Sequence, residues 1–126
     1  MPDLAERIAK WAVETVSFNR LPQEVVEEAK KRVVDTLGVA LGAFSEEPPS
    51  IARWVAESSS SSRLGATIWG TSRRGPADHA TFANGCAARY FDFNDTYLSR
   101  EALHPSDNLA PVMAAAEIAE ADGSKV

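Results

Sequence analysis

The sequence predicts an all-α fold in a single domain that spans residues 1–126. Apolar residues recur at steps of three and four through most of the chain, which is typical of amphipathic helices. One short segment, residues 66–70, is rich in β-branched and aromatic residues. The composition, 44% hydrophobic and 25% charged, is that of a globular domain with its own core. We see no internal repeat and no sign of a second domain.

The first two helices follow from their apolar patterns. Residues 4–17 place their apolar side chains on one face, and Asp3 with Glu6 resembles an N-terminal capping pair. Pro22 suits the first turn of a second helix, where a missing N–H costs nothing. That helix continues to about residue 44 and is apolar nearly all round in its second half, so we expect this half to be buried.

The middle of the chain is predicted to contain a short helix and a loop. Gly38 and Gly42 lie four residues apart, which would let another helix pack closely against the second helix. Residues 46–49, with two prolines, are expected to break that helix, and a third helix is predicted over residues 51–57. The five serines at 58–62 predict a solvated loop.

The last part of the chain predicts one extended segment and two helices. Residues 66–70 predict a short strand or hairpin. A fourth helix with a thin, alanine-rich surface is predicted over residues 76–91, and such a helix can pack on several sides. A fifth helix is predicted from Ser106 or Asp107, either of which can cap it, to about residue 121.

Charge and cysteine content limit the function classes. The net charge is −5 and the sequence has no stripe of basic residues, so it lacks the charge pattern typical of nucleic-acid binding. Cys86 is the single cysteine, which excludes an internal disulfide and fits a reducing compartment. No signal peptide is visible, and the longest apolar run, residues 33–44, is far shorter than the ~20 residues of a membrane span. We therefore expect a soluble, cytoplasmic protein with no membrane partner.

The candidate site lies within residues 90–108, where side chains able to carry protons crowd together between two predicted helices. Histidine titrates near neutral pH, so His104 is the natural proton carrier, with Asp92 as its partner or as a second acid or base. On spacing alone, a capping or hydrogen-bonding role is the more frequent one for a loop histidine. Asn94 and Asp95 could equally hold the loop by bonding backbone amides.

Arg89 and Ser106 each have two possible roles, and two metal arrangements can be tested against the sequence. Arg89 can bind a carboxylate through both ends of its guanidinium or pair with an acidic neighbour, and Ser106 can cap a helix or contact substrate. A calcium loop starting at Asp92 is excluded, because Tyr97 and Leu103 stand where glycine and glutamate are required. Asp92, Asp95 and His104 lack the spacing typical of a divalent-metal site. No phosphate-binding glycine loop is present, so we expect neither metal nor cofactor.

The run Asp92-Phe93-Asn94-Asp95-Thr96, followed by His104-Pro105-Ser106-Asp107-Asn108, closely resembles the signature of the MmgE/PrpD family. That family contains 2-methylcitrate dehydratases, cis-aconitate decarboxylase and their relatives. Asn94 and the complete second motif resemble the dehydratase branch more than the decarboxylase branch. Residues 22–42 and 83–85 fit the same family in the same order. Family members are several times longer, so the chain resembles the N-terminal part of such an enzyme and of its large helical domain.

The resemblance implies a hydro-lyase that dehydrates 2-methylcitrate, or a close tricarboxylate, to 2-methyl-cis-aconitate without a metal. Asp92 and His104 match the family's catalytic positions, and the expected substrate-binding residues are Asn94, Asp95, Arg89 and Ser106. The complete enzyme is expected to be a homodimer, and this chain alone to be inactive. The alternatives are decarboxylation of cis-aconitate, epimerisation of an amino-dicarboxylate, and a non-catalytic helical assembly module.

Overall fold

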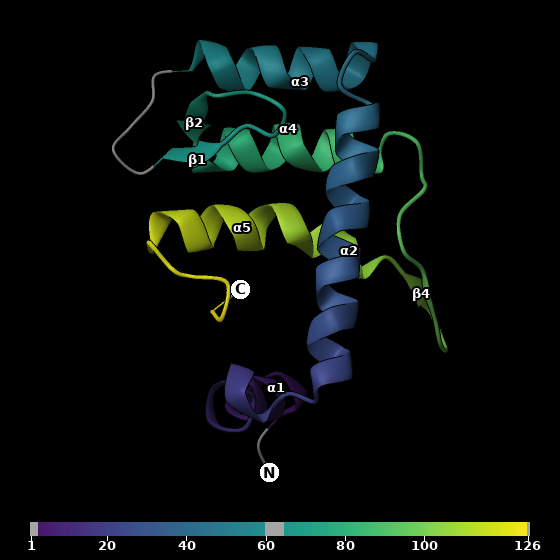
Figure 1. Cartoon of the computed structure of the whole chain (residues 1–126), viewed down its shortest axis with the longest axis vertical. Helices are drawn as coiled ribbons and strands as arrows, with labels where there is room; N and C mark the ends of the chain where they lie inside the picture. The colour runs from purple at the N-terminus through teal and green to yellow at the C-terminus, as the bar shows by residue number, and fades with distance from the viewer. Residues whose placement is uncertain (1–2, 60–64, 126) are drawn as a thin grey trace. The chain divides into compact units, whose positions relative to one another are not determined.

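The structure is a computed structural model that describes residues 3–59 and 65–125 (Figure 1). The chain divides into two compact units, Met1–Lys30 and Lys31–Val126. The described residues form five α-helices and only two small two-stranded sheets, so the predicted all-α fold class is confirmed by a mostly helical structure. The single domain over residues 1–126 stays a prediction. No helix in the described ranges is both long and apolar enough to cross a membrane.

The first unit contains α1 (Leu4–Glu14), a 3-10 turn (Phe18–Arg20) and the start of α2 (Gln23–Gly42). The predicted cap at Asp3 is confirmed, because its Oδ1 accepts from the backbone N–H of Glu6 at 2.8 Å. The helix ends at Glu14, three residues before the predicted end. None of its residues is buried, although the pattern predicts an apolar face.

The second half of α2 belongs to the second unit and differs from expectation. Its buried residues are Thr36 and Ala40, one turn apart, whereas Val34 is 71% exposed and Leu41 is 51% exposed. The expectation that the whole second half is buried is therefore wrong, because only one stripe of the helix meets other elements. Gly42 lies near the ring of Phe91, where an added Cβ would stand 3.7 Å from its Cε2 atom.

The third helix, α3 (Glu47–Ser58), begins earlier than the sequence predicts. The preceding helix α2 ends at Gly42, before the break predicted at residues 46–49, and Pro48 and Pro49 lie in the first turn of α3, where the missing N–H groups would have no helical partner. The turn before α3 is closed by Arg53, whose Nη1 donates to the backbone oxygen of Phe44 at 2.7 Å. The same guanidinium lies 3.7 Å from the centre of the Phe44 ring. The five serines predicted as a loop lie partly outside the described residues.

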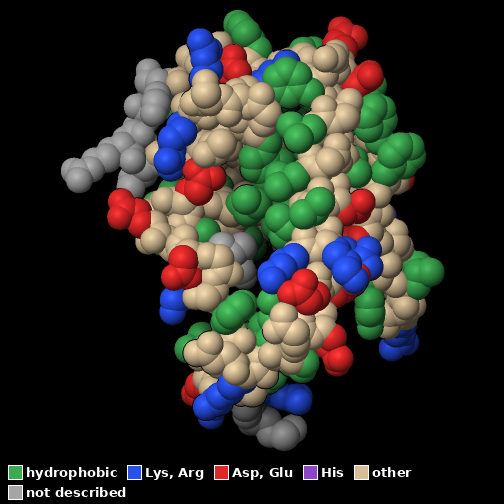
Figure 2. All heavy atoms as spheres, viewed as in Figure 1, with side chains coloured by type: hydrophobic (Ala, Val, Ile, Leu, Met, Phe, Trp, Pro, Cys, Tyr) green, Lys and Arg blue, Asp and Glu red, His purple; other side chains and the backbone are tan. Residues whose placement is uncertain are grey.

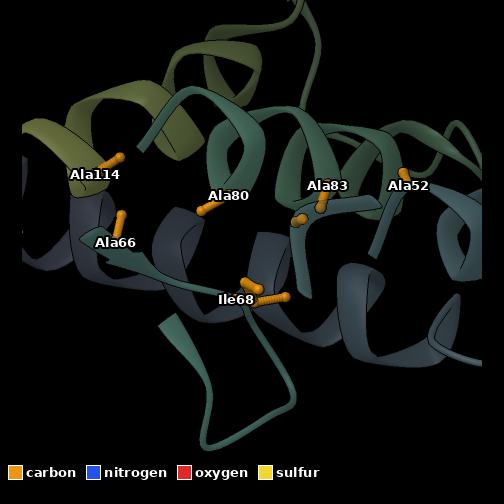
Figure 3. Close-up of a cluster of buried hydrophobic side chains, with 7 residues drawn as sticks. Ala52, Ala66, Ile68, Ala80, Ala83 and Ala114 are labelled. Atoms are coloured by element: carbon orange, nitrogen blue, oxygen red, sulfur yellow. The ribbon is translucent and has the colours of Figure 1, made fainter. Parts of the chain in front are cut away.

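The core of the second unit surrounds α4 (Ala77–Arg89), which lies between α3 and α5 (Leu109–Ile118) (Figure 1). A hairpin of β1 (Gly65–Thr67) and β2 (Arg74–Pro76) packs against these helices, which confirms the predicted extended segment. Figure 3 shows how small the buried side chains are; the cluster comprises Ala52, Ala56, Ala66, Ile68, Ala80, Ala83 and Ala114. The predicted thin surface of the fourth helix thus allows close packing on several sides.

Two polar side chains attach the hairpin to the helices. Asn84 of α4 is 4% exposed; its Oδ1 accepts from the backbone N–H of Trp69, and its Nδ2 donates to the backbone oxygen of Thr67, each at 2.9 Å. From α5, Glu117 accepts from the backbone N–H of Thr67 at 2.9 Å and from its hydroxyl at 2.7 Å. These bonds satisfy backbone groups that the short strands leave unpaired.

The segment after α4 contains elements that the sequence did not predict. The fourth helix ends at Arg89 rather than at residue 91. A second hairpin, β3 (Tyr97–Leu98) and β4 (Ala102–Leu103), follows, and all four of its strand residues are exposed. A 3-10 turn, η2 (Pro105–Asn108), then precedes α5, so the predicted fifth helix begins later than expected and has no side-chain cap from Asn108.

Large apolar side chains remain on the surface of the second unit. Apolar atoms gather on the face of this unit seen in Figure 2. The most exposed of these side chains on helices are Val34, Trp54 and Phe82, at 71%, 67% and 60%. The tryptophan and phenylalanine lie on α3 and α4, the same helices whose alanines form the core. The core is thus built from small residues, and much of the bulky apolar surface faces outward.

Candidate active site

The two halves of the candidate motif meet between the end of α4 and η2. Arg89 is the last residue of α4, Asn94 lies in the loop that follows, and Ser106 lies in η2. The hairpin of β3 and β4 carries the chain out from Asp95 and back to His104. Hydrogen bonds between the loop and η2 close this arrangement at its base. The structure thus brings together the cluster that the sequence predicts.

Arg89 forms the charged side of the cluster. Its Nη1 lies 3.0 Å from Oδ1 of Asp92 and donates to Oδ1 of Asn94 at 3.1 Å, while its Nε lies 3.4 Å from Oδ1 of Asp107. A cation in the last turn of a helix is favoured by the negative end of the helix dipole. The structure therefore shows Arg89 paired with acidic neighbours, which is one of the two roles that the sequence allows for it.

Asn94 and Ser106 form the buried side of the cluster. They are 8% and 7% exposed, and Nδ2 of Asn94 donates to Oγ of Ser106 at 3.1 Å. Because Oδ1 of Asn94 already accepts from Arg89, both ends of this amide are occupied by protein groups. These contacts hold the loop against η2. The predicted substrate contacts of both residues stay predictions.

Asp95 contacts η2 and His104 with two different atoms. Its Oδ1 accepts from the backbone N–H of Ser106 at 3.0 Å, and its backbone oxygen lies 2.8 Å from Nδ1 of His104. Asp95, rather than Ser106 or Asp107, therefore supplies the side-chain oxygen for a backbone N–H in this turn. The loop-holding role is the one that these contacts describe.

His104 presents one ring nitrogen to the loop, and its tautomer follows from that contact. A carbonyl oxygen can only accept a hydrogen bond, so the Asp95 oxygen at 2.8 Å assigns the proton to Nδ1. In the neutral ring, Nε2 then carries the free lone pair. The hydroxyl of Thr96 lies 3.5 Å from the same Nδ1, at the limit of a hydrogen bond. A neutral His104 held in this way is chemically a base at Nε2.

Asp92 has a different neighbourhood from the one predicted for it. Its carboxylate is 70% exposed and pairs with Arg89, and its backbone is in the left-handed region at a φ of 55°. The ring contacts of His104 in the described chain are with Asp95 and Thr96 instead. The structure thus places the two predicted catalytic residues in one loop region, each with its own partners. Left-handed backbone at a non-glycine residue is found disproportionately at functional sites.

An aromatic group lies beside the cluster. The Tyr90 and Phe91 rings meet edge to face with centres 5.0 Å apart, and Phe91 stacks on Phe93 at 5.7 Å. The phenol of Tyr90 donates to Oε2 of Glu46 at 3.1 Å. This hydrogen bond, together with the negative charge of Glu46, raises the pKa of Tyr90 above its ordinary value of 10.0. These contacts join the end of α4 to the start of α3.

Sequence reasoning missed three features of this region. The contact of Thr96 with His104 and the pairing of Asp107 with Arg89 depend on how the loop folds back, which spacing does not show. The exposed hairpin between the two motifs was also missed.

No group of three or more histidine, cysteine, aspartate or glutamate side chains within residues 3–59 and 65–125 is arranged to hold a metal ion.

Comparison with known proteins agrees with the motif and its surroundings. The chain matches the MmgE/PrpD N-terminal domain over residues 6–126. It is 33% identical over 105 residues to the cis-aconitate decarboxylase of Homo sapiens, a match that covers 82% of this chain and 21% of that protein. It is 34% identical over 93 residues to the 2-methylcitrate dehydratase of Cupriavidus necator, which covers 72% of this chain and 19% of that protein.

A third relative covers more of the chain. The 2-methylcitrate dehydratase of Salmonella typhimurium is 30% identical over 118 residues, which is 92% of this chain and 24% of that protein. The chain thus spans about a fifth to a quarter of the length of the curated relatives that it matches. The match to the domain covers nearly all of the chain and includes every residue of the cluster. The chain belongs to the MmgE/PrpD family.

Proposed function

We propose that this chain forms part of a hydro-lyase that dehydrates 2-methylcitrate, or a close tricarboxylate, to 2-methyl-cis-aconitate without a metal ion. The observation that carries the proposal is the contact of His104 with the backbone oxygen of Asp95 at 2.8 Å. It leaves Nε2 of a neutral His104 as a base in the same loop region as Asp92, whose exposed carboxylate pairs with Arg89. Relatives named 2-methylcitrate dehydratase support the choice of substrate.

The reaction needs a base and an acid. The base removes a proton from a carbon next to a carboxylate, and the electron pair of that C–H bond forms the new double bond as the C–O bond breaks. The leaving hydroxyl takes a proton from the acid and departs as water. In the proposal, Nε2 of His104 is the base, and Asp92 acts as a second acid or base. Arg89, Asn94 and Ser106 are the proposed substrate-binding residues, together with Asp95, which can also act by holding the loop.

The substrate's charge requires more cations than the cluster offers. Arg89 is already paired with Asp92 and Asp107, and this chain carries a net charge of −5. A tricarboxylate bound here would therefore meet little uncompensated positive charge. We propose that further cationic groups come from parts of the full-length enzyme outside these 126 residues. The chain alone is then expected to be inactive.

Decarboxylation of cis-aconitate is the second candidate. The identity of 33% to the decarboxylase of Homo sapiens is within one percentage point of the 34% to the dehydratase of Cupriavidus necator, so identity does not separate them. Asn94 and the complete motif from His104 to Asn108 favour the dehydratase. A non-catalytic assembly module would convert neither substrate, nor would its melting temperature rise with either one.

The test is an absorbance assay on the full-length protein with 2-methylcitrate in the presence of a chelator. We expect a rise in ultraviolet absorbance from the conjugated alkene, which His104→Ala abolishes. His79→Gln is the matched control, because His79 lies in α4 and is the other histidine of this chain. Silence with 2-methylcitrate, together with release of carbon dioxide from cis-aconitate, would replace the proposal by the second candidate.

We also propose that the complete enzyme is a homodimer. The support is the set of large apolar side chains that stay exposed on the second unit, since extended exposed apolar surface marks protein–protein contacts. Light scattering coupled to size-exclusion chromatography on the full-length protein tests this, and a monomer at micromolar concentration would contradict it.

A further inference from the structure

We propose that Asp95 is a positioning residue that fixes the tautomer of His104, and so makes Nε2 the basic nitrogen. This inference rests on the proposed function, because it concerns the base that the dehydration needs. Asp95 acts through His104 and does not need to touch the substrate. Its two contacts, with His104 and with Ser106, lie on either side of Pro105.

The side chain of Asp95 anchors the loop at the nearest available donor. Pro105 has no backbone N–H, so the N–H of Ser106 is the first backbone donor after His104. Oδ1 of Asp95 accepts from it at 3.0 Å. The backbone oxygen of the same residue therefore faces the His104 ring, because side chain and carbonyl belong to one fixed residue. Loss of the carboxylate would free this carbonyl to turn away.

The neighbouring hairpin cannot supply the same restraint. Its strands, β3 and β4, are two residues long, pair only with each other in the described chain, and are exposed throughout. Two-stranded hairpins of this kind are at best marginally stable in water. The position of His104 therefore depends on the base of the hairpin, where Asp95 makes both of its contacts.

Thr96 provides an alternative hydrogen-bond partner for His104, so the tautomer of His104 depends on Asp95. Its hydroxyl lies 3.5 Å from Nδ1 of His104, and a hydroxyl can donate as well as accept. With the Asp95 carbonyl in place, Nδ1 carries the proton and Nε2 is the base. Without it, the Thr96 hydroxyl can donate to Nδ1, which places the ring proton on Nε2. The same histidine would then have no free lone pair toward the substrate.

The tautomer can be measured directly by nitrogen NMR of the histidine rings. The chain has two histidines, so His79→Gln leaves His104 as the single signal. Two-bond proton–nitrogen correlations distinguish the two neutral tautomers from each other and from the doubly protonated ring, so the tautomer is read from the spectrum of the neutral ring. We expect Nδ1 to resonate as a protonated nitrogen and Nε2 as an unprotonated one in this chain.

Three substitutions in the His79→Gln background separate positioning from general damage. Asp95→Ala is expected to shift the His104 signals toward the tautomer protonated at Nε2. Asp95→Asn keeps an oxygen acceptor for Ser106 and is expected to keep the wild-type pattern. Asp92→Ala removes a nearby carboxylate that pairs with Arg89 rather than with His104, and is expected to leave the tautomer unchanged.

Activity of the full-length protein provides the second readout. Asp95→Ala is expected to lower kcat by about 10²-fold, with a smaller change in KM. This is the lower end of the range for the contribution of a general base. Asp95→Asn is expected to recover most of this loss. A merely structural role would lower the amount of folded protein and leave the tautomer of the folded fraction as it was.

The inference is overturned if the chain without Asp95 substitutions already shows the proton on Nε2. That measurement needs no variant at Asp95, so it decides even if Asp95→Ala fails to fold. A folded Asp95→Ala protein with an unchanged tautomer would also overturn it. If the tautomer behaves as expected but 2-methylcitrate is not converted, the substrate proposal fails and the positioning role stands. If His104-dependent dehydration occurs but the ring proton is on Nε2, the positioning role fails and the substrate proposal stands.

Discussion

The side-chain amide of Asn94 donates to the hydroxyl of Ser106 at 3.1 Å, and this bond is buried. The residues belong to the two halves of the motif, which are separated in sequence by the exposed hairpin. Since the other end of the amide accepts from Arg89, one side chain joins the end of α4, the loop and η2. The motif is therefore a packed unit in its own right.

Asn94→Ala is expected to lower the free energy of unfolding by about 1–3 kcal/mol, because it leaves the buried Ser106 hydroxyl without its donor. Urea unfolding followed by circular dichroism measures the change. The matched control is Asn108→Ala, since Asn108 is exposed and its side chain makes a longer bond, 3.4 Å, to the backbone oxygen of Pro105. Equal stability of the two variants would show that the buried amide is not a structural tie.

Asn84→Ala is expected to release one end of the first hairpin. The variant removes the acceptor for the Trp69 N–H and the donor to the Thr67 oxygen, which costs about 1–3 kcal/mol. Hydrogen exchange gives a residue-level check. The Trp69 amide should lose protection, whereas the Thr67 amide should keep more of its own, because it donates to Glu117. Equal loss at both amides would mean that the whole hairpin has opened.

Gly70→Ala and Gly38→Ala are expected to change stability in opposite directions. Gly70 has a φ of +77°, and an added Cβ would lie 2.7 Å from Cδ2 of Phe44, so the variant should lose more than about 1 kcal/mol. Gly38 lies within α2 with nothing within 4 Å of an added Cβ, so alanine should stabilise by about 0.5–1 kcal/mol. Thermal unfolding of both variants tests the pair. A stabilised Gly70→Ala protein would contradict the geometry of this turn.

The helices could be predicted because their signals are local. Asp3 caps α1 as expected, and the alanines of α4 predict its central place. The start of α3 was predicted at residue 51 instead of Glu47. Prolines can end one helix and can also form the first turn of the next, so Pro48 and Pro49 do not fix the boundary. The burial of α2 was overestimated for a different reason: an apolar pattern shows what a helix can bury and not what covers it.

The candidate site was predictable as a cluster but not as a set of contacts. Residues 90–108 stand out because titratable side chains crowd there. Their partners depend on how the loop folds back, which is a tertiary property. Asp92 pairs with Arg89 and not with His104. The ring of His104 instead contacts a backbone oxygen, a kind of contact that no sequence motif encodes. The hairpin of β3 and β4 was missed because strands of two exposed residues carry no periodic signal.

Tyr90 is expected to titrate above its ordinary pKa of 10.0, because its phenol donates to the Glu46 carboxylate and that charge opposes ionisation. The chain has two tyrosines, so Tyr97→Phe isolates Tyr90 in an absorbance titration near 295 nm. Adding Glu46→Ala should return the midpoint toward 10.0. Since the folded-state pKa is raised, the bond stabilises the fold below pH 10 and this stabilisation is lost as the pH rises through the folded-state value. If the Tyr90 midpoint is the same with and without Glu46, the two side chains do not form this hydrogen bond in solution.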